Sequence, residues 1–212
     1  MPKFPPLQYI TGPGSPEEII SRVEANLTAG IRWIQLRYKY KLDEAHLKNY
    51  VAIGQEVSKL CKEYDAVFIV NDKIEYVDIF NADGVHVGLE DAPLAVARRV
   101  IGSKKILGAT ANTWQQVASA SKGGADYIGL GPYRFTQTKE KLAPVLGDVG
   151  YTDIMARVAL KSINCPIYAI GGIGPGDVPA LIKTGVSGIA ASSALEEAAT
   201  RKKMLEAIKH WN

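Results

Sequence analysis

The sequence predicts a single (β/α)8 barrel domain that spans residues 1–212. Short runs rich in Ile, Val, Leu or Tyr alternate with longer amphipathic segments from one end of the chain to the other. Eight such runs and about as many helical segments fit this length, which is typical of a closed parallel barrel. The alternative, a doubly wound open sheet, usually carries a G-x-G-x-x-G turn after its first strand, and the segment ITGPGS does not fit that pattern.

The predicted strands are short, as is typical of parallel strands that are buried on both faces. They cover residues 7–11, 31–37, 67–71, 84–87, 105–109, 127–130, 167–170 and 188–191. The predicted helices include residues 16–29, 43–63, 92–101, 113–123, 175–184 and 195–208. Ser15, Pro16 and the two glutamates after them supply an N-cap, a first-turn proline and acidic side chains, and Thr113 is predicted to cap a later helix.

Composition and charge exclude several classes of protein. The net charge of +3 is small and the Lys and Arg residues are dispersed, so no nucleic-acid partner is expected. Cys61 and Cys165 show no C-x-x-C or zinc-ligand spacing, which favours reduced, buried thiols. The N-terminal segment lacks the apolar core of a signal peptide and no apolar run is long enough to cross a bilayer, so we expect a cytoplasmic protein with no membrane partner. The oligomeric state is left open, with a homo-oligomer among the possible states.

Function in such a barrel is expected at the carboxyl ends of the strands. Gln35, Arg37 and Lys39 alternate at the end of the second strand, so they are predicted to point to the same side, into the barrel mouth. An unpaired Arg and Lys are costly to bury there, and an anionic ligand such as a phosphate group would supply their partner. Ion pairs with acidic residues of the same chain are the alternative.

The third and fourth predicted strands lead to carboxylates. Asn71 and Asp72 end the third strand, and the segment after the fourth leads to Asp91. One or two carboxylates together with substrate phosphates are a common way to hold Mg²⁺. Asp72 and Asp91 are therefore candidate magnesium ligands, with simple ion pairs to Arg37 and Lys39 as the alternative.

Hydroxyl and ammonium groups follow the fifth and sixth strands. Thr110 and Asn112 come at the end of the fifth strand. The sixth strand runs into Gly-Pro and then into Thr136, Thr138 and Lys139. Because a plain strand turn usually carries Asn, Asp or Gly, this cluster indicates a bound anion.

Glycines and serines follow the seventh and eighth strands. Gly171 and Gly172 leave backbone N–H groups open to the close approach of a ligand, and Ser192 and Ser193 lead into a helix. The loops after these two strands are the usual phosphate site of such barrels. Tight turns and a helix cap are the simpler interpretation. Two anion sites, one at strands two and six and one at strands seven and eight, fit two phosphate-bearing small-molecule substrates better than one.

The chain resembles the thiamine phosphate synthase family over nearly its whole length. The resemblance rests on segments in the family's order and spacing, namely QLRYK, VND, ADGVHVGLED, ILGATANT, GADYIGLGPYRFTQTK, AIGGI and GIAASSAL. It implies a Mg²⁺-assisted transferase that joins hydroxymethylpyrimidine diphosphate to thiazole phosphate, giving thiamine phosphate and pyrophosphate. The aminopyrimidine can spread positive charge, which favours a dissociative substitution that needs no protein nucleophile.

The resemblance also implies a role for each matching residue. The expected pyrophosphate contacts are Gln35, Arg37, Lys39, Asn71 and Thr110. The expected Mg²⁺ ligands are Asp72 and Asp91. The expected thiazole-phosphate contacts are Thr136, Thr138, Gly172 and the backbone near Ser193. Lys139 is expected between the two substrates. The residues expected to stabilise the negative charge on the leaving pyrophosphate are Arg37, Lys39 and Lys139.

Some residues depart from the family's pattern. Leu89 stands where Gln is usual, and Thr110 replaces Ser while keeping the hydroxyl. Tyr133, Arg134 and Phe135 replace a more usual Ile-Phe/Tyr-Pro. Arg134 adds a charge near the site, which either tunes phosphate binding or lies in solvent.

Three other functions would fit the same barrel. The thiazole tautomerase paralogue carries a histidine at the position of Pro132 and has degraded metal-site acids, whereas Asp72 and Asp91 are kept here; His86 is expected to pack within a strand. A non-catalytic barrel that binds a phosphorylated ligand would not need these acids or Lys139 to stabilise a leaving group. An isomerase or epimerase of sugar phosphates would need a general base, for which either acid is a candidate.

Overall fold

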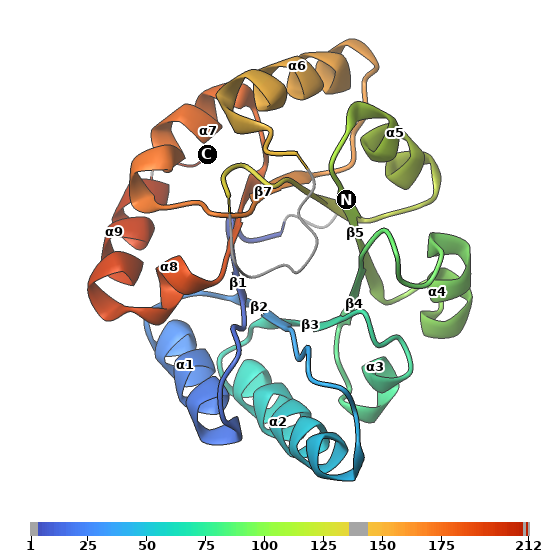
Figure 1. Ribbon diagram of the computed structural model, residues 1–212, viewed down its shortest axis with the longest axis vertical. Coiled ribbons are helices and arrows are strands. Elements are labelled where there is room, and N and C mark those ends of the chain that lie inside the picture. The colour runs from blue at the N-terminus through green and yellow to red at the C-terminus, as the bar shows by residue number, and fades with distance from the viewer. Residues whose placement is uncertain (1–3, 136–143, 210, 212) are drawn as a thin grey trace.

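Eight parallel strands close into a barrel in sequence order in the computed structural model, which describes residues 4–135, 144–209 and 211. The strands are β1 (Leu7–Ile10), β2 (Trp33–Leu36), β3 (Val67–Asn71), β4 (Gly84–Val87), β5 (Ile106–Ala111), β6 (Tyr127–Leu130), β7 (Ile167–Ile170) and β8 (Gly188–Ala191). The pairing of β1 with β8 closes the sheet. Figure 1 looks down this barrel, with the helices arranged around the ring of strands. The predicted (β/α)8 barrel is confirmed.

The helices follow the strands around the ring. They are α1 (Pro16–Thr28), α2 (Glu44–Glu63), α3 (Tyr76–Ile79), α4 (Leu94–Ile101), α5 (Trp114–Lys122), α6 (Gly147–Leu160), α7 (Val178–Thr184), α8 (Ser193–Glu196) and α9 (Ala198–Ile208), with a 3-10 turn η1 (Pro175–Asp177) before α7. Within the described ranges, none of these helices has the length and apolar character that a membrane span requires.

Some helices differ from those predicted. The predicted helices did not include α3, whose four residues are too few to show a helical period. They also did not include α6, because Val149 and Leu160 are exposed and blur its amphipathic pattern. The helix predicted over 195–208 is divided into α8 and α9 at Glu197, whose backbone is extended and whose carboxylate accepts the N–H groups of Ala199 and Thr200.

Both predicted helix caps are present. The Ser15 Oγ accepts the N–H of Glu18 at 3.3 Å, and the Glu18 carboxylate accepts the N–H of Ser15 at 2.9 Å, which makes a capping box at the start of α1. The Thr113 hydroxyl accepts the N–H of Gln116 at 3.3 Å at the start of α5. These contacts satisfy N–H groups that a helix leaves unpaired, so they fix where the two helices begin.

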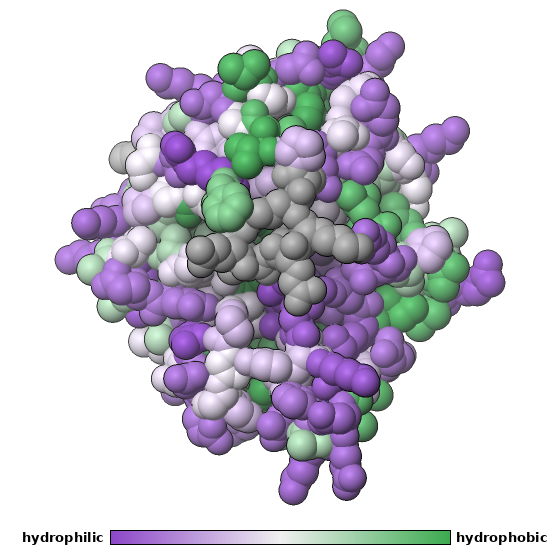
Figure 2. Space-filling view, viewed as in Figure 1, coloured by the Kyte–Doolittle hydropathy of each residue, from purple (hydrophilic) through white to green (hydrophobic). Residues whose placement is uncertain are grey.

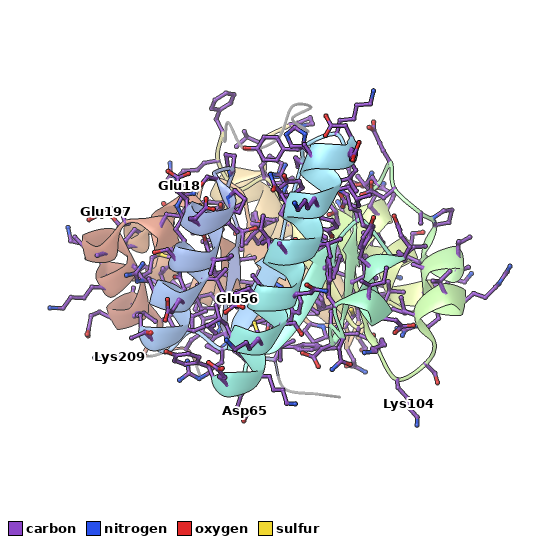
Figure 3. All side chains as sticks on the ribbon, turned by 90° about the horizontal axis from the view of Figure 1, so that it is seen from below. Glu18, Glu56, Asp65, Lys104, Glu197 and Lys209 are labelled. Atoms are coloured by element: carbon purple, nitrogen blue, oxygen red, sulfur yellow. The ribbon has the colours of Figure 1, made fainter. Side chains whose placement is uncertain are left out.

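The direction of the strands can be followed in a side view. Asp65 and Lys104, which precede β3 and β5, lie at one edge of the molecule in Figure 3, and Glu18, which follows β1, lies toward the opposite edge. The carboxyl ends of the strands therefore open at the edge near Glu18. Figures 1 and 2 look onto this mouth of the barrel.

An interior floor closes the barrel near the amino ends of the strands. This interior floor consists of Phe4, Trp33, Ile69, Tyr127 and Tyr168. The Trp33 ring stacks on Phe4 at 5.0 Å between centroids and meets the edges of Tyr127 and Tyr168, each at 4.8 Å. A Cβ atom at Gly108 would lie 2.3 Å from the Tyr127 ring, so only glycine leaves room for it. The strand alternation puts the remaining apolar residues in a second layer, between sheet and helices.

Removal of the central ring of the interior floor is expected to destabilise the fold. Trp33 is 0% exposed, so Trp33→Ala should lower the free energy of unfolding by about 3–5 kcal/mol through lost burial and the cavity left behind. Urea denaturation followed by circular dichroism measures this. Leu160→Ala is the control, because Leu160 is 80% exposed and should change stability by no more than about 0.5 kcal/mol. Equal stability of the two variants would contradict this description of the core.

The two cysteines are expected to be unreactive in the folded protein. Cys61 and Cys165 are buried free thiols, and burial raises the pKa of each to about 12. Only about one thiol in 10⁴ is then ionised at pH 8, and the thiolate is the reactive form. A chromogenic disulfide reagent should therefore react more than about 10²-fold faster in denaturant than with the native protein. Rapid modification of either thiol in the native protein would be inconsistent with this burial.

Candidate active site

A layer of buried and half-buried polar side chains adjoins the interior floor and shares Tyr127 with it. The Gln35 Nε2 donates to the Gln8 Oε1 at 3.3 Å, and the Gln8 Nε2 donates to the Tyr127 hydroxyl at 3.4 Å. The His86 ring meets the Tyr127 hydroxyl through Nδ1 at 3.0 Å and the Thr110 Oγ1 through Nε2 at 2.9 Å. This polar layer, formed by Gln8, Gln35, His86, Thr110 and Tyr127, connects five of the strands. It fixes the Thr110 hydroxyl, which the sequence predicts to contact substrate.

Sequence reasoning gives no site role to part of this polar layer. Gln8 and Tyr127 are not among the predicted site residues, and His86 is expected only to pack within a strand. His86 is indeed buried, but both of its ring nitrogens are hydrogen bonded, so it also positions Thr110. Each of these polar residues stands at an inward position of an otherwise apolar strand. Since a buried polar group needs hydrogen-bond partners, that pattern could have indicated a polar layer inside the barrel.

The end of β2 carries the predicted cationic pair. Leu36 packs in the outer core and Gln35 in the interior, which is the alternation that the sequence predicts. The Thr11 hydroxyl binds both backbone groups of Arg37, the residue after Leu36. The Thr11 Oγ accepts the Arg37 N–H at 2.8 Å and donates to the Arg37 carbonyl at 3.1 Å. Arg37 is half-buried, and Lys39, two residues on, is 49% exposed and forms an ion pair with Asp72.

The two predicted metal ligands are neighbours. Asp72 has a left-handed backbone with φ of 66°, and its N–H donates to the His86 carbonyl at 2.8 Å. Asp91 accepts the Gly88 N–H at 2.7 Å. Burial, and after it the adjacent Asp72 carboxylate, raises the pKa of Asp91 above its ordinary value. A cation placed between the two carboxylates would relieve this repulsion.

The structure is compatible with both interpretations of Asp72 and Asp91, as partners in ion pairs and as ligands of Mg²⁺. The Lys39–Asp72 contact is the ion pair that the sequence left as the alternative. Among the residues that the structure describes, no group of three or more His, Cys, Asp or Glu side chains is placed to hold a metal ion. Two carboxylates side by side nevertheless fit Mg²⁺, which usually takes one or two carboxylates and completes its shell with water and phosphate oxygens.

Two asparagines lie at the ends of β3 and β5. Asn71 is the last residue of β3 and is buried beneath the mouth. The Asn112 side chain donates to the Gly131 carbonyl, and its backbone N–H donates to the Gln116 Oε1 at 2.7 Å. Asn112 therefore ties the end of β5 to the end of β6, which is a structural use of this side chain.

The residues after β6 are described as far as Phe135. The predicted substrate contacts Thr136, Thr138 and Lys139 lie outside the described residues and stay predictions.

The unusual Tyr-Arg-Phe segment after β6 has structural partners. The Tyr133 hydroxyl donates to the Asp148 Oδ1 at 2.5 Å. The Arg134 guanidinium donates to the Asp177 Oδ1 at 2.5 Å through one terminal nitrogen, so its charge is paired within the chain. Phe135 is 67% exposed. The Arg134 side chain is 59% exposed, so it does lie in solvent, which is one of the two possibilities expected from the sequence, but its ion pair with Asp177 was not expected.

The glycines after β7 make room for the same segment. Gly171 and Gly172 have φ of 96° and 67°, which other residues rarely adopt. The Arg134 N–H donates to the Gly171 carbonyl at 2.9 Å, and a Cβ atom at Gly172 would lie 2.7 Å from the Phe135 carbonyl oxygen. The structure therefore gives both glycines a packing reason, in addition to the ligand contact predicted for Gly172.

The predicted residues fall into two groups around the mouth. Arg37, Lys39, Asp72 and Asp91 follow the adjacent strands β2, β3 and β4, which lie side by side in Figure 1. Gly172 and the pair Ser192–Ser193, where α8 begins, follow β7 and β8 on another arc. Much of the surface on this side of the molecule is hydrophilic in Figure 2.

Comparisons with known proteins identify what the chain is similar to. A sequence model of the family described as thiamine monophosphate synthase matches residues 7–195. The thiamine-phosphate synthase of Flavobacterium johnsoniae is 40% identical over 200 residues, or 94% of this chain and 92% of that protein. That of Flavobacterium psychrophilum is 43% identical over 191 residues, or 90% and 91%. The solved structure of a thiamine phosphate pyrophosphorylase from Pyrococcus furiosus gives a TM-score of 0.79 at 31% identity and covers 96% of this chain and 95% of that one.

Proposed function

Because this chain belongs to the thiamine monophosphate synthase family of transferases, we propose that it joins hydroxymethylpyrimidine diphosphate to thiazole phosphate, giving thiamine phosphate and pyrophosphate. The observation that carries the proposal is the grouping of two cationic and two acidic side chains on adjacent strands. These are Arg37 and Lys39 after β2, Asp72 after β3 and Asp91 after β4. A diphosphate with its metal ion has the complementary charges.

The reaction places new negative charge on the leaving group. The bond between the pyrimidine methylene carbon and a diphosphate oxygen breaks, and that oxygen keeps the electron pair. The thiazole nitrogen then forms a bond to the same carbon. Cationic side chains aimed at the leaving oxygens lower the barrier because the charge is larger in the transition state than in the substrate. Arg37 can bind two of these oxygens through its planar guanidinium, and Lys39 adds a point charge.

The carboxylate pair fits the metal that the family implies. Asp72 and Asp91 would hold Mg²⁺, which when bound supplies further positive charge to the diphosphate oxygens. Lys39 lies against Asp72 and is therefore within reach of the same diphosphate. Asn71, Thr110 and the more deeply buried Gln35 would add polar contacts to the diphosphate from the barrel interior.

The second substrate is assigned to the other arc of the mouth. Thr136 and Thr138 would bind the thiazole phosphate together with Gly172, Ser192 and Ser193, and Lys139 would lie between the two substrates. The aminopyrimidine can carry the positive charge left by departing pyrophosphate, so the substitution is proposed to be dissociative. The protein then has to orient the two substrates and exclude water, and it needs no nucleophile of its own.

The test separates this activity from that of the tautomerase paralogue. Pro132 is buried where a tautomerase is expected to carry its histidine, so that position holds no titratable group. The pure protein should form thiamine phosphate and pyrophosphate from both phosphorylated precursors and Mg²⁺. In a parallel assay it should leave thiazole carboxylate phosphate unchanged. Tautomerised thiazole carboxylate phosphate in the second assay, with no product in the first, would assign the chain to the paralogue.

A further inference from the structure

Lys73 lies beside the proposed diphosphate site, yet its ammonium group points to protein backbone. The Lys73 Nζ donates to the Tyr38 carbonyl oxygen at 3.0 Å and lies 5.4 Å from the centroid of the Tyr50 ring. The side chain is half-buried, and Tyr50 is fully buried. A half-buried ammonium group loses some of its hydration, which a carbonyl and an aromatic face replace here.

Tyr38, whose carbonyl oxygen accepts the Lys73 hydrogen bond, lies between the two cationic residues proposed to bind the diphosphate. Tyr38 stands between Arg37 and Lys39 in the chain. It is 4% exposed, and its ring stacks on Tyr50 at 5.2 Å between centroids with an interplanar angle of 26°. Lys73 therefore holds Tyr38 by its backbone while Tyr50 holds it by its ring. Movement at Tyr38 would displace the residues on both sides of it.

Lys73 also belongs to the turn that orients Asp72. Its N–H donates to the Asn71 carbonyl at 2.8 Å, which closes the turn around the left-handed backbone of Asp72. Such a conformation costs about 1 kcal/mol or more in a residue with a side chain, so the surrounding contacts must hold it. Two contacts thus join the loops after β2 and β3. Lys39 of the first loop pairs with the Asp72 carboxylate of the second, and Lys73 of the second loop donates to the Tyr38 carbonyl of the first.

The two links differ in the groups that they use. The Lys39–Asp72 pair uses groups that the proposed function assigns to diphosphate and Mg²⁺, so it must rearrange when they bind. The Lys73–Tyr38 link uses neither. We propose that Lys73 is a positioning residue that keeps Arg37 and Lys39 aimed into the mouth for the diphosphate substrate; this rests on the proposed function of the same site.

The test compares Lys73→Met with Lys73→Arg. Lys73→Met keeps the length of the side chain but removes the donor and the charge, so the KM for the pyrimidine diphosphate should rise about tenfold, because small displacements of binding groups are costly. The KM for thiazole phosphate should stay within about twofold of the wild type, since its proposed contacts lie on the other arc. Lys73→Arg can still donate to the Tyr38 carbonyl and should recover most of the loss.

A matched control lies at the opposite end of the barrel. Lys105 precedes β5, and its Nζ donates to the Ala82 carbonyl at 2.5 Å, so Lys105→Met removes the same kind of bond far from the mouth. It should affect only the free energy of unfolding. An unchanged diphosphate KM in Lys73→Met, or equal rises in both KM values, would overturn the positioning role.

Binding of pyrophosphate separates this inference from the proposed function. Calorimetry with pyrophosphate and Mg²⁺ should give a Kd about tenfold higher for Lys73→Met than for the wild type, whether or not turnover is observed. Lys105→Met should bind like the wild type. Failure of the wild type to form thiamine phosphate would contradict the proposed function alone. Equal pyrophosphate affinity in Lys73→Met and wild type, or no binding by either, would overturn the role of Lys73.

Discussion

Arg37→Ala is expected to lower turnover by about 10²-fold while the protein stays folded, by analogy with loss of one donor from an oxyanion site. Arg37 follows β2, and Thr11 holds its backbone on both sides, so the strand end should keep its place when the side chain is shortened. What is lost is a guanidinium that can bind two oxygens of the leaving pyrophosphate. Lys139→Ala is expected to have an effect of the same order, if the ammonium group lies between the substrates as the family resemblance implies.

The measurement is steady-state turnover at saturating substrates, with circular dichroism to verify folding. Arg32→Ala is the matched control, because Arg32 begins the same strand region at the opposite end of the barrel and donates to the Leu27 carbonyl at 2.6 Å. That variant should lose some stability and keep its turnover. Wild-type turnover in either Arg37→Ala or Lys139→Ala would contradict the roles assigned to these residues.

Asp72→Asn and Asp91→Asn are each expected to raise the Mg²⁺ concentration for half-maximal rate by about tenfold or more, and to lower turnover at fixed Mg²⁺. Asparagine suits both positions. It tolerates the left-handed backbone of Asp72, and at residue 91 its side-chain oxygen can still accept the Gly88 N–H. The change therefore removes one negative charge and leaves the backbone of each loop in place, although at residue 72 it also removes the charge partner of Lys39.

A magnesium titration of initial rate at fixed substrate distinguishes this effect from a general loss of activity. Asp78→Asn is the control, because Asp78 lies exposed on α3 and should leave the magnesium dependence unchanged. Magnesium curves for both site variants that coincide with that of the wild type would show that Asp72 and Asp91 do not hold the metal. The contact between Lys39 and Asp72 would then be a structural ion pair.

The fold could be predicted because its signals are local and repeated. Four-residue apolar strands such as Tyr127–Leu130 and Gly188–Ala191 stand out between polar segments, and their predicted bounds match the structure. Caps such as Ser15 fix helix starts through contacts a few residues apart. The prediction missed α6, because exposed Val149 hides the pattern on which a helix is recognised.

The candidate site was predicted in part. The alternation of Gln35 and Leu36 at the end of β2 follows from strand geometry, and the structure has it. Asp72 could pair with a lysine or help to hold a metal ion. Which of these it does depends on where two loops meet in space, and spacing along the chain does not determine that. The structure supplies the Lys39–Asp72 pair and the neighbouring Asp91.

Contacts between distant parts of the chain account for what the sequence could not predict. His86 and Thr110 are 24 residues apart and meet only because β4 and β5 are neighbours. Lys73 reaches the carbonyl of Tyr38 across 35 residues. Neither contact has a sequence motif, since a lysine or histidine in these segments is equally compatible with a place at the surface or in the core.

The most direct test of the proposed function is to quantify both products in a single reaction. The pure protein is incubated with hydroxymethylpyrimidine diphosphate, thiazole phosphate and Mg²⁺, and thiamine phosphate and pyrophosphate are measured over time. We predict that the two products appear in equal amounts, and that neither appears when either substrate is omitted. Pyrophosphate released without thiamine phosphate, or no release by a folded protein with both substrates present, would contradict the proposal.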